Sequence, residues 1–424
     1  MEPDYSPLDL ETIFAASKIP SGEDADPDPL VRTGHVVFEY KDSYPYGYEV
    51  RAFGPVFAGG SDAEPACVGY LEADETWLLG QVQDCLSEWE QYIGKYYDIP
   101  GGTFAPDREH IEAAVPALAE AGDRLFSVVF LQGDAGLSEI GRMLIDAMQT
   151  GEQVITFASD RIFIPWWIMY SDPGPAGNGG NAHWSPAGFW GYRHLLEHEF
   201  IRFGTCADHR IPVADEPLRV SLNLDLGLDG GGVPVTEPVL EFFAARGAAS
   251  AHVIRTTSLE LGEALMSPDF GDQLMYFCCH CGAQQSPYGG PSRSVLQLTD
   301  TGTFITPAHV SGWLRGRELI SNPLIFINAC GGGLLSTHFY CSFSHELLRK
   351  AANCLLGPGV RVPGPFAAKY AIELLARFLE PHCRLGTAMR DVTRYLMDHC
   401  HTPLGLIYGL YRGLDTRLVA GHVG

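Results

Sequence analysis

The sequence has little positive charge and no long apolar run. Of its 424 residues 28 are Lys or Arg and 52 are Asp or Glu, so the formal net charge is −24 at pH 7. Because DNA, RNA and anionic membranes are bound mainly through Lys and Arg contacts, this balance excludes them as primary partners. The apolar run IFIPWWIMY has nine residues, whereas a bilayer-spanning helix needs about 20.

The chain also lacks the marks of a secreted protein. Its first residues, MEPDYSPLDLETIF, are acidic, whereas a secretory signal places positive charge before an apolar stretch. The eleven cysteines are an odd number spread over a long chain, unlike the dense, even framework of a small secreted domain. We therefore expect a cytoplasmic protein with reduced thiols. With 46% hydrophobic residues, wholesale disorder is excluded.

Composition and periodicity predict three parts. Residues 1–32 are rich in Asp, Pro and Gly and read as an acidic flexible leader. Residues 33–210 and 211–424 are predicted to form an N-terminal and a C-terminal α/β half. In the first half the patterns predict strands at 35–40, 48–53, 127–133 and 153–160, and helices at 75–96, about 107–121 and 136–149.

The second half alternates strands and helices. The predicted strands are 219–228, 252–256, 273–280 and 323–330, and the predicted helices between them are 236–247 and 259–267. Most of these strands are short, wholly apolar runs, as expected of parallel strands covered on both faces. The fold class predicted for the chain is therefore α/β, a mostly parallel sheet flanked by helices.

Two predicted strands end in reactive side chains. Strand 273–280 ends at His280, and strand 323–330 ends at Cys330, which three glycines follow. In parallel sheets, ligands and reactive groups lie outside the carboxyl ends of the strands. If the two strands are neighbours, His280 and Cys330 share one crevice, an arrangement that suits a thiol nucleophile and an imidazole base.

This order and spacing resembles the caspase-like cysteine peptidases of the caspase–gingipain–separase group, and within it the CHAT proteases. Further similar segments are ITFASDRIFIPWWIMY (155–170), LQLTDTGTFITPAHVSGW (296–313), PFAAKYAIELLARFLE…RLGTAMRDVTRYLM (365–397) and YGLYRGLD (408–415). The resemblance covers most of residues 33–415. It implies a caspase-like sheet, with the N-terminal half as a pseudo-caspase-like α/β unit.

The resemblance implies a role for each residue of the motif. His280 is the expected general base and acid, and Cys330 the nucleophile. Backbone N–H groups of Cys281, Gly282 and Gly331 are the expected oxyanion hole. Three departures from the family pattern matter. Cys281 intervenes between His280 and the usual glycine, Pro165-Trp166-Trp167 replaces a Pro-Trp-Glu, and Asn328 stands two residues before Cys330.

Substrate recognition is expected close to the same strand ends. Asn328 stands two residues before the expected nucleophile, where caspases have Gln and metacaspases Asp, so the residue type preferred before the scissile bond (P1) stays open. Five aspartates are predicted to lie near strand ends or in the hairpin between His280 and Cys330, and Asp225 and Asp300 among them are the expected substrate-binding residues: Asp225, Asp229, Asp269, Asp272 and Asp300. If one of the five lines the P1 pocket, a basic P1 residue is favoured.

Several other patterns have simpler explanations. Cys278 and Cys281 form a CxxC, but zinc requires two further ligands and core packing is the favoured reading. His194 and His198 show the HxxEH order of some zinc peptidases, although an ordinary helix face explains them better. GNGGN (177–181) lacks the phosphate-binding loop pattern. Neither a metal nor a cofactor is therefore expected.

The function predicted from the sequence is that of a cysteine endopeptidase acting on a protein or peptide substrate. The family resemblance implies a bacterial defence or cell-death setting, including antiviral defence, and activation by a protein partner or by processing. The alternative is a catalytically inactive signalling or scaffold module that retains the caspase-like fold. The inserted Cys281 and the missing Glu after Trp166 favour this alternative.

Overall fold

The structure is a computed structural model that describes residues 30–44, 46–61, 64–97, 108–171, 184–200, 209–213, 217–284, 293–329, 343 and 346–420. Contacts divide the chain into two compact units. Unit 1 comprises residues 1–28, 205–392 and 410–424, and unit 2 comprises residues 29–204 and 393–409. None of the helices in the described ranges is both long enough and apolar enough to cross a bilayer.

Unit 1 contains a parallel sheet in the order β10-β9-β11-β14-β15. Its strands are β9 (Leu218–Leu224), β10 (Ser250–Arg255), β11 (Leu274–Cys278), β14 (Leu324–Ile327) and β15 (Cys354–Pro358). Every residue of β11, β14 and β15 is buried, because helices cover both faces of this sheet. The predicted α/β class and parallel strands are confirmed.

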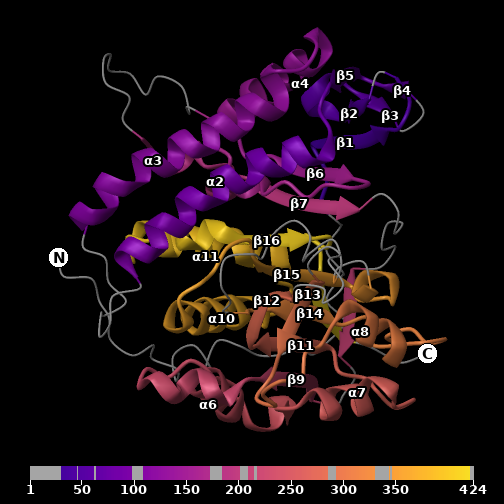
Figure 1. Cartoon of the computed structure of the whole chain (residues 1–424), viewed down its shortest axis with the longest axis vertical. Helices are drawn as coiled ribbons and strands as arrows, with labels where there is room; N and C mark the ends of the chain where they lie inside the picture. The colour runs from indigo at the N-terminus through magenta and orange to yellow at the C-terminus, as the bar shows by residue number, and fades with distance from the viewer. Residues whose placement is uncertain are drawn as a thin grey trace. The chain divides into compact units, whose positions relative to one another are not determined.

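The helices of unit 1 lie in two layers (Figure 1). On one face α6 (Glu237–Ala245) packs against α10 (Gly364–Phe378), and on the other α7 (Ser258–Met266) packs against α8 (Pro307–Trp313). A capping box formed by Thr257 and Glu260 begins α7, which satisfies amide groups that the first helical turn leaves unpaired. The sequence predicted α6 and α7 to within two residues at each end.

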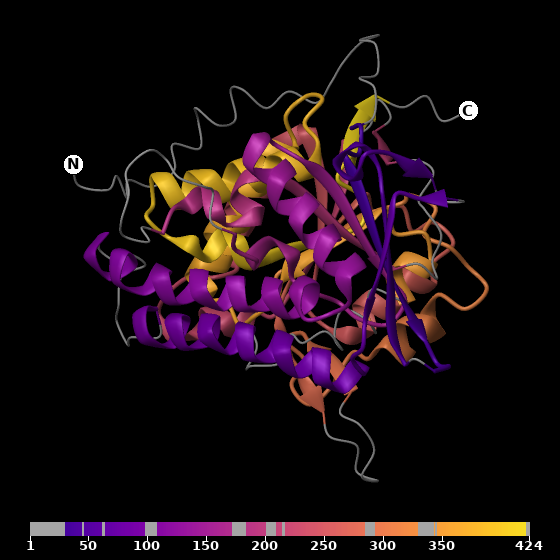
Figure 2. The same cartoon turned by 90° about the horizontal axis from the view of Figure 1, so that it is seen from above.

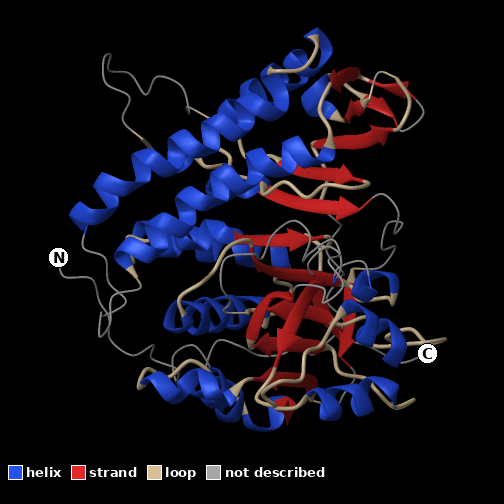
Figure 3. Ribbon diagram, viewed as in Figure 1, coloured by secondary structure: helices blue, strands red, loops and turns tan. Residues whose placement is uncertain are grey.

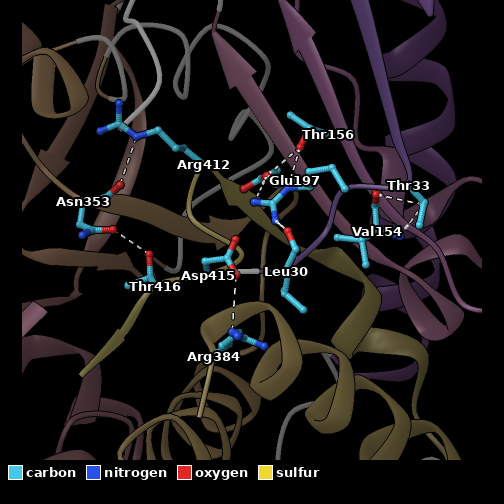
Figure 4. Close-up of polar contacts among 11 residues, drawn as sticks. Leu30, Thr33, Val154, Thr156, Glu197, Asn353, Arg384, Arg412, Asp415 and Thr416 are labelled. Carbon is cyan, nitrogen blue, oxygen red and sulfur yellow. Dashed lines mark hydrogen bonds and ion pairs between the residues drawn. The ribbon is translucent and has the colours of Figure 1, made fainter. Parts of the chain in front are cut away.

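Smaller elements complete unit 1. They are the hairpin of β12 (His280–Gln284) and β13 (Arg293–Gln297), and the parallel pair of β8 (Arg210–Val213) and β17 (Arg417–Ala420). Figure 4 shows part of the polar network around residues 412–416, which precede β17. Arg412 donates to the Asn353 carbonyl, and the Thr416 hydroxyl donates to the Asn353 side chain at 2.7 Å.

Unit 2 has its own mixed sheet, in the order β7-β6-β1-β2-β5. The strands are β1 (Gly34–Lys41), β2 (Gly47–Phe53), β5 (Cys67–Leu71), β6 (Val154–Ser159) and β7 (Leu195–Phe200), with a short hairpin of β3 (Gly60–Ser61) and β4 (Glu64–Pro65). β1, β6 and β7 run parallel, whereas β2 pairs antiparallel with β1 and β5.

Three long helices belong to this unit: α2 (Glu75–Tyr96), α3 (Arg108–Phe126) and α4 (Ala135–Thr150). α2 and α3 lie side by side (Figures 1 and 2), and α4 packs on β5. The sequence predicted α2 with its bounds. α5 (Trp190–Arg193) is a single turn before β7, while α11 (Leu385–Asp398) and β16 (Tyr408–Tyr411) each include a residue at which the chain passes between the units.

Two sequence-based predictions in unit 2 are wrong, and the second concerns β7, which is drawn as a strand in Figure 3. Residues 127–131, predicted as a strand, form a π-helical turn that continues α3, because a short apolar run does not distinguish a buried helix from a strand. The segment around His198, read as a helix face, is β7, and it pairs in register with β6 from Leu195 to Phe200. Pairing with a neighbour far away in sequence overrides the local pattern there.

A buried ion pair joins the start of the described chain to β7. The guanidinium of Arg32, which the sequence analysis placed in the leader, lies 2.7 Å from Glu197 Oε1. The Thr156 hydroxyl of β6 donates to the same oxygen at 2.7 Å (Figure 4). The Glu197 side chain is 1% exposed and that of Arg32 15%. A carboxylate this deeply buried requires its cation.

Replacing Arg32 by Ala is therefore expected to lower the free energy of unfolding of unit 2 by about 3–5 kcal/mol. Urea denaturation followed by tryptophan fluorescence measures it, because six of the seven tryptophans lie in residues 29–204. Arg142→Ala is the matched control, since Arg142 pairs with Glu139 on an exposed helix face, where ion pairs contribute little. Equal unfolding curves for the two variants would contradict the role of the buried pair.

Candidate active site

The strand order of unit 1 reverses beside β11. From β9 the chain crosses through α6 to β10 on one side, and from β11 it continues through α8 to β14 on the other side. Such a reversal opens a crevice outside the carboxyl ends of the two neighbouring strands, β9 and β11. Asp225 directly follows β9, and His280 lies two residues after β11.

These two side chains face each other. His280 Nε2 lies 3.5 Å from Asp225 Oδ2. The Asp225 side chain is 8% exposed, whereas that of His280 is 54% exposed, so the imidazole reaches solvent while the carboxylate stays beneath it. Asp225 Oδ1 accepts from the Gly227 N–H at 2.9 Å, which leaves Oδ2 for the ring. A carboxylate held against one ring nitrogen sets the tautomer and orientation of a histidine.

Thr299 fixes the turn that carries Asp225. Its hydroxyl accepts from the Leu226 N–H at 2.8 Å and lies 3.2 Å from the Leu224 carbonyl, so it contacts the backbone on both sides of Asp225. The Asp225 N–H in turn donates to the Cys278 carbonyl at 2.8 Å. Sequence reasoning missed Thr299, because one threonine in the stretch LTDTGT carries no distinguishing pattern.

β14 pairs with β11 in parallel register, from Leu274 opposite Leu324 to Phe277 opposite Ile327. This pairing confirms that the strands preceding His280 and Cys330 are neighbours. Cys330 and Gly331 themselves lie outside the described residues. Ala329, the last described residue before them, is fully buried.

Asn328 does not have the predicted substrate-binding environment. Its side chain is fully buried, and its Nδ2 donates to the Tyr276 hydroxyl at 3.0 Å and to the Ala367 carbonyl at 2.7 Å. An amide whose two hydrogens are used inside the core holds strands and helix together. We therefore reassign Asn328 from substrate recognition to anchoring the end of β14 against α10.

Asp300 contacts the first residue of helix α7. Its Oδ2 accepts from the backbone N–H of Ser258 at 2.9 Å and from the Ser258 hydroxyl at 2.6 Å. Ser258 is the first residue of α7, so the carboxylate satisfies groups at the start of this helix. Of the two aspartates predicted to bind substrate, Asp225 is the one in contact with His280.

The predicted oxyanion residues Cys281 and Gly282 lie in the hairpin that begins at His280. Cys281 pairs with Leu296 and Gly282 with Val295. Because Leu296 exchanges its backbone hydrogen bonds with Ile305, the register turns the Cys281 N–H away from β13. The Cys281 side chain is buried, and a side chain on Gly282 would meet open space.

The described residues contain no cluster of three or more side chains suited to holding a metal. Cys278 ends β11 and Cys281 lies in β12, so the CxxC is split between two strands. His194 and His198 flank and occupy β7, where both are buried. The Gln153 N–H donates to His194 Nδ1, and Trp166 Nε1 donates to His198 Nδ1, each at 3.1 Å. Acceptor nitrogens of this kind belong to neutral rings.

Comparisons with known proteins find similarity both in sequence and in structure. No protein-family model matches the chain. A probable protease from Vitiosangium sp. is 29% identical over 230 residues, which is 53% of this chain and 29% of that protein. The chain thus aligns with less than a third of its curated relative.

The structure is also similar to two crystal structures of the Saccharomyces cerevisiae separase–securin complex. The TM-scores are 0.37 and 0.38 at 10% identity, covering 80% of this chain and 22% and 23% of those chains.

The two buried histidines predict a loss of stability in acid. Burial lowers the pKa of both His194 and His198 to about 3, whereas an unfolded histidine has a pKa near 6.5. Between these values the unfolded chain binds protons that the folded chain does not, so stability falls as the pH drops. Between pH 7 and pH 5 each histidine is expected to remove about 2 kcal/mol from the free energy of unfolding.

The variant His198→Gln retains an acceptor for Trp166 and does not titrate. It is expected to lose about 2 kcal/mol less than the wild type over the same interval. Urea denaturation of unit 2 at several pH values checks this difference. Parallel curves of stability against pH for both proteins would show that His198 is not a buried neutral group.

Proposed function

We propose that the chain is a cysteine endopeptidase of the caspase-like, CHAT type, with Cys330 as nucleophile and His280 as general base and acid. The observation that carries the proposal is the meeting of Asp225 and His280 at the carboxyl ends of β9 and β11, with β14 leading to Cys330 alongside. The similarity to a probable protease over half the chain supports the same reaction class.

The proposed reaction proceeds in two halves. His280 takes the proton of the Cys330 thiol, and the thiolate attacks the carbonyl carbon of the scissile peptide. When the C–N bond breaks, the imidazolium gives its proton to the leaving amine and a thioester remains. His280 then removes a proton from water, hydroxide attacks the thioester, and the acid is released with restoration of the thiol.

Charge develops on the substrate oxygen in both halves. We assign its stabilisation to backbone N–H groups of Cys281 and Gly331, since donors fixed in place before the reaction require no reorganisation. Gly282, also predicted for this role, pairs with Val295 at the next, hydrogen-bonded position of the hairpin, which directs its N–H to β13 instead. The hairpin supports the contribution of Cys281, because its register turns that N–H away from β13.

Asp225 is proposed as the positioning residue for His280. Its carboxylate is buried, held by Gly227 and bracketed by Thr299, and it faces the ring at 3.5 Å. The expectation of a basic P1 residue stays a prediction. Of the aspartates named for it, Asp225 faces His280 and Asp300 binds Ser258 through one carboxylate oxygen. The substrate is proposed to be a partner protein, with activation by a further protein or by processing, in a defence or cell-death pathway.

Loss of either reacting group is expected to abolish cleavage. Cys330→Ala and His280→Ala should each lower peptide turnover by on the order of 10³-fold or more, with unfolding curves like that of the wild type. Cleavage profiling with a peptide library measures the loss. Cys67→Ala, which removes a half-buried thiol in unit 2, is the control and should retain activity. Turnover by folded Cys330→Ala would overturn the proposal.

The role of Asp225 is separable from substrate binding. If Asp225 positions His280, Asp225→Asn should lower kcat by about 10²-fold, the lower end of what acid–base catalysis contributes, with KM unchanged. Asp225→Glu should recover part of the rate. If instead KM rises for Arg and Lys substrates alone while kcat holds, Asp225 reads the P1 residue and the positioning role is wrong.

A further inference from the structure

Unit 1 has a basic pocket beside α8. Its volume is about 600 Å³, and α8 together with the residues just after it forms one wall while residues 346–350 form the other. The polar side chains that line it are Ser311, Arg315, Glu346, Arg349 and Lys350. We call the cavity lined by these five side chains the basic pocket. It is distinct from the Asp225–His280 site.

Three cations and one anion line this pocket. Arg349 lies 2.7 Å from Glu346 and 3.4 Å from the Ser311 hydroxyl, so these two charges neutralise each other. Lys350 donates to the Arg317 carbonyl at 3.2 Å. Neither Arg315 nor Lys350 has an acidic partner among the described residues. In a chain with 52 acids and 28 bases, a cavity with two uncompensated cations is not the background composition of the surface.

The walls of the basic pocket flank the stretch that carries the proposed nucleophile. α8 precedes β14, which leads to Cys330, and residues 346–350 come just before β15. A ligand in this pocket therefore contacts the chain on both sides of residues 330–342.

We propose that the basic pocket binds the acidic leader of the same chain, through the part that precedes the first described residue, Leu30. Residues 1–29 contain eight Asp or Glu and one Lys, and four of the acids, Glu23, Asp24, Asp26 and Asp28, fall within six positions. Carboxylates on such a segment match the uncompensated cations of the basic pocket.

The length of the leader permits this contact whatever the arrangement of the two units. Twenty-nine residues span up to about 95 Å when extended, whereas a chain of 424 residues has a radius of gyration of about 22 Å when compact. Single exposed ion pairs are weak, but a tether raises the effective concentration of the segment to about the millimolar range. The contact is thus weak, reversible and sensitive to salt.

The binding itself does not require peptidase activity, so it is tested without measuring cleavage.

Zero-length carbodiimide cross-linking of the full chain tests the binding directly, because it joins an amine to a carboxylate that touches it. The chain has only five lysines, Lys18, Lys41, Lys95, Lys350 and Lys369. We expect a cross-link between Lys350 and an acid of residues 1–29 at low salt. It should fall by about tenfold in 1 M salt, where the screening length is about 3 Å, and by a similar factor in Arg315→Glu.

One control is internal to the sample, and the other is a variant. Lys41 lies 3.0 Å from Glu39 and 3.6 Å from Glu49, so its cross-links report that the reagent is active. Lys350→Arg preserves the charge and removes the amine, and it should lose only the Lys350 product. An active reagent that gives no Lys350–leader product overturns the proposal.

A mixture of unlabelled and ¹⁵N-labelled protein separates contact within one chain from contact between copies. Products of mixed isotope content would show that the leader of a second copy occupies the pocket, which contradicts binding within the chain. Because cleavage is not measured, loss of the cross-link and failure of the peptidase assay are independent results.

Discussion

The parallel pairing of β9, β11 and β14 is the constraint on which the proposed chemistry depends. These short strands are buried along nearly their whole length, so their register is set by core packing. The connection after β9 leads to β10 on one side, and the connection after β11 leads to β14 on the other side. This divergence opens a crevice at the carboxyl ends of β9 and β11. Asp225, His280 and the segment leading to Cys330 are brought to one edge for this reason, although more than 50 residues separate Asp225 from His280 in the sequence.

Around this edge buried and half-buried polar groups fix the positions of the strand ends. Thr299 holds the turn of Asp225 from both sides, and Asn328 ties the end of β14 to Tyr276 and α10. His280 is the half-exposed member of this set, and the carboxylate of Asp225 faces its ring. A nucleophile and base of the proposed kind require such a frame, because a base that is misplaced by an ångström loses much of its effect.

The sequence was informative where one local rule was enough. The amphipathic spacing of residues 75–96 predicted α2, and the apolar runs predicted β9, β10, β11 and β14 in a parallel sheet. It failed where a partner distant in sequence decides the outcome. β7 is a strand because β6 pairs with it, Asn328 is buried because Tyr276 and Ala367 accept its hydrogens, and Asp300 faces Ser258. The contact of Asp225 with His280 likewise depends on strand order, which local patterns do not contain.

The central claim is that Cys330 is a nucleophile activated by His280, and a covalent probe tests it most directly. A peptidyl acyloxymethyl ketone is added at limiting concentration, and the modified residue among the eleven cysteines is identified by mass spectrometry. The account predicts a single adduct, on Cys330, that forms at a greatly reduced rate in His280→Ala, because an imidazole beside the thiol favours the thiolate. Labelling spread over several cysteines, or labelling of Cys330 at the same rate in His280→Ala, would contradict it.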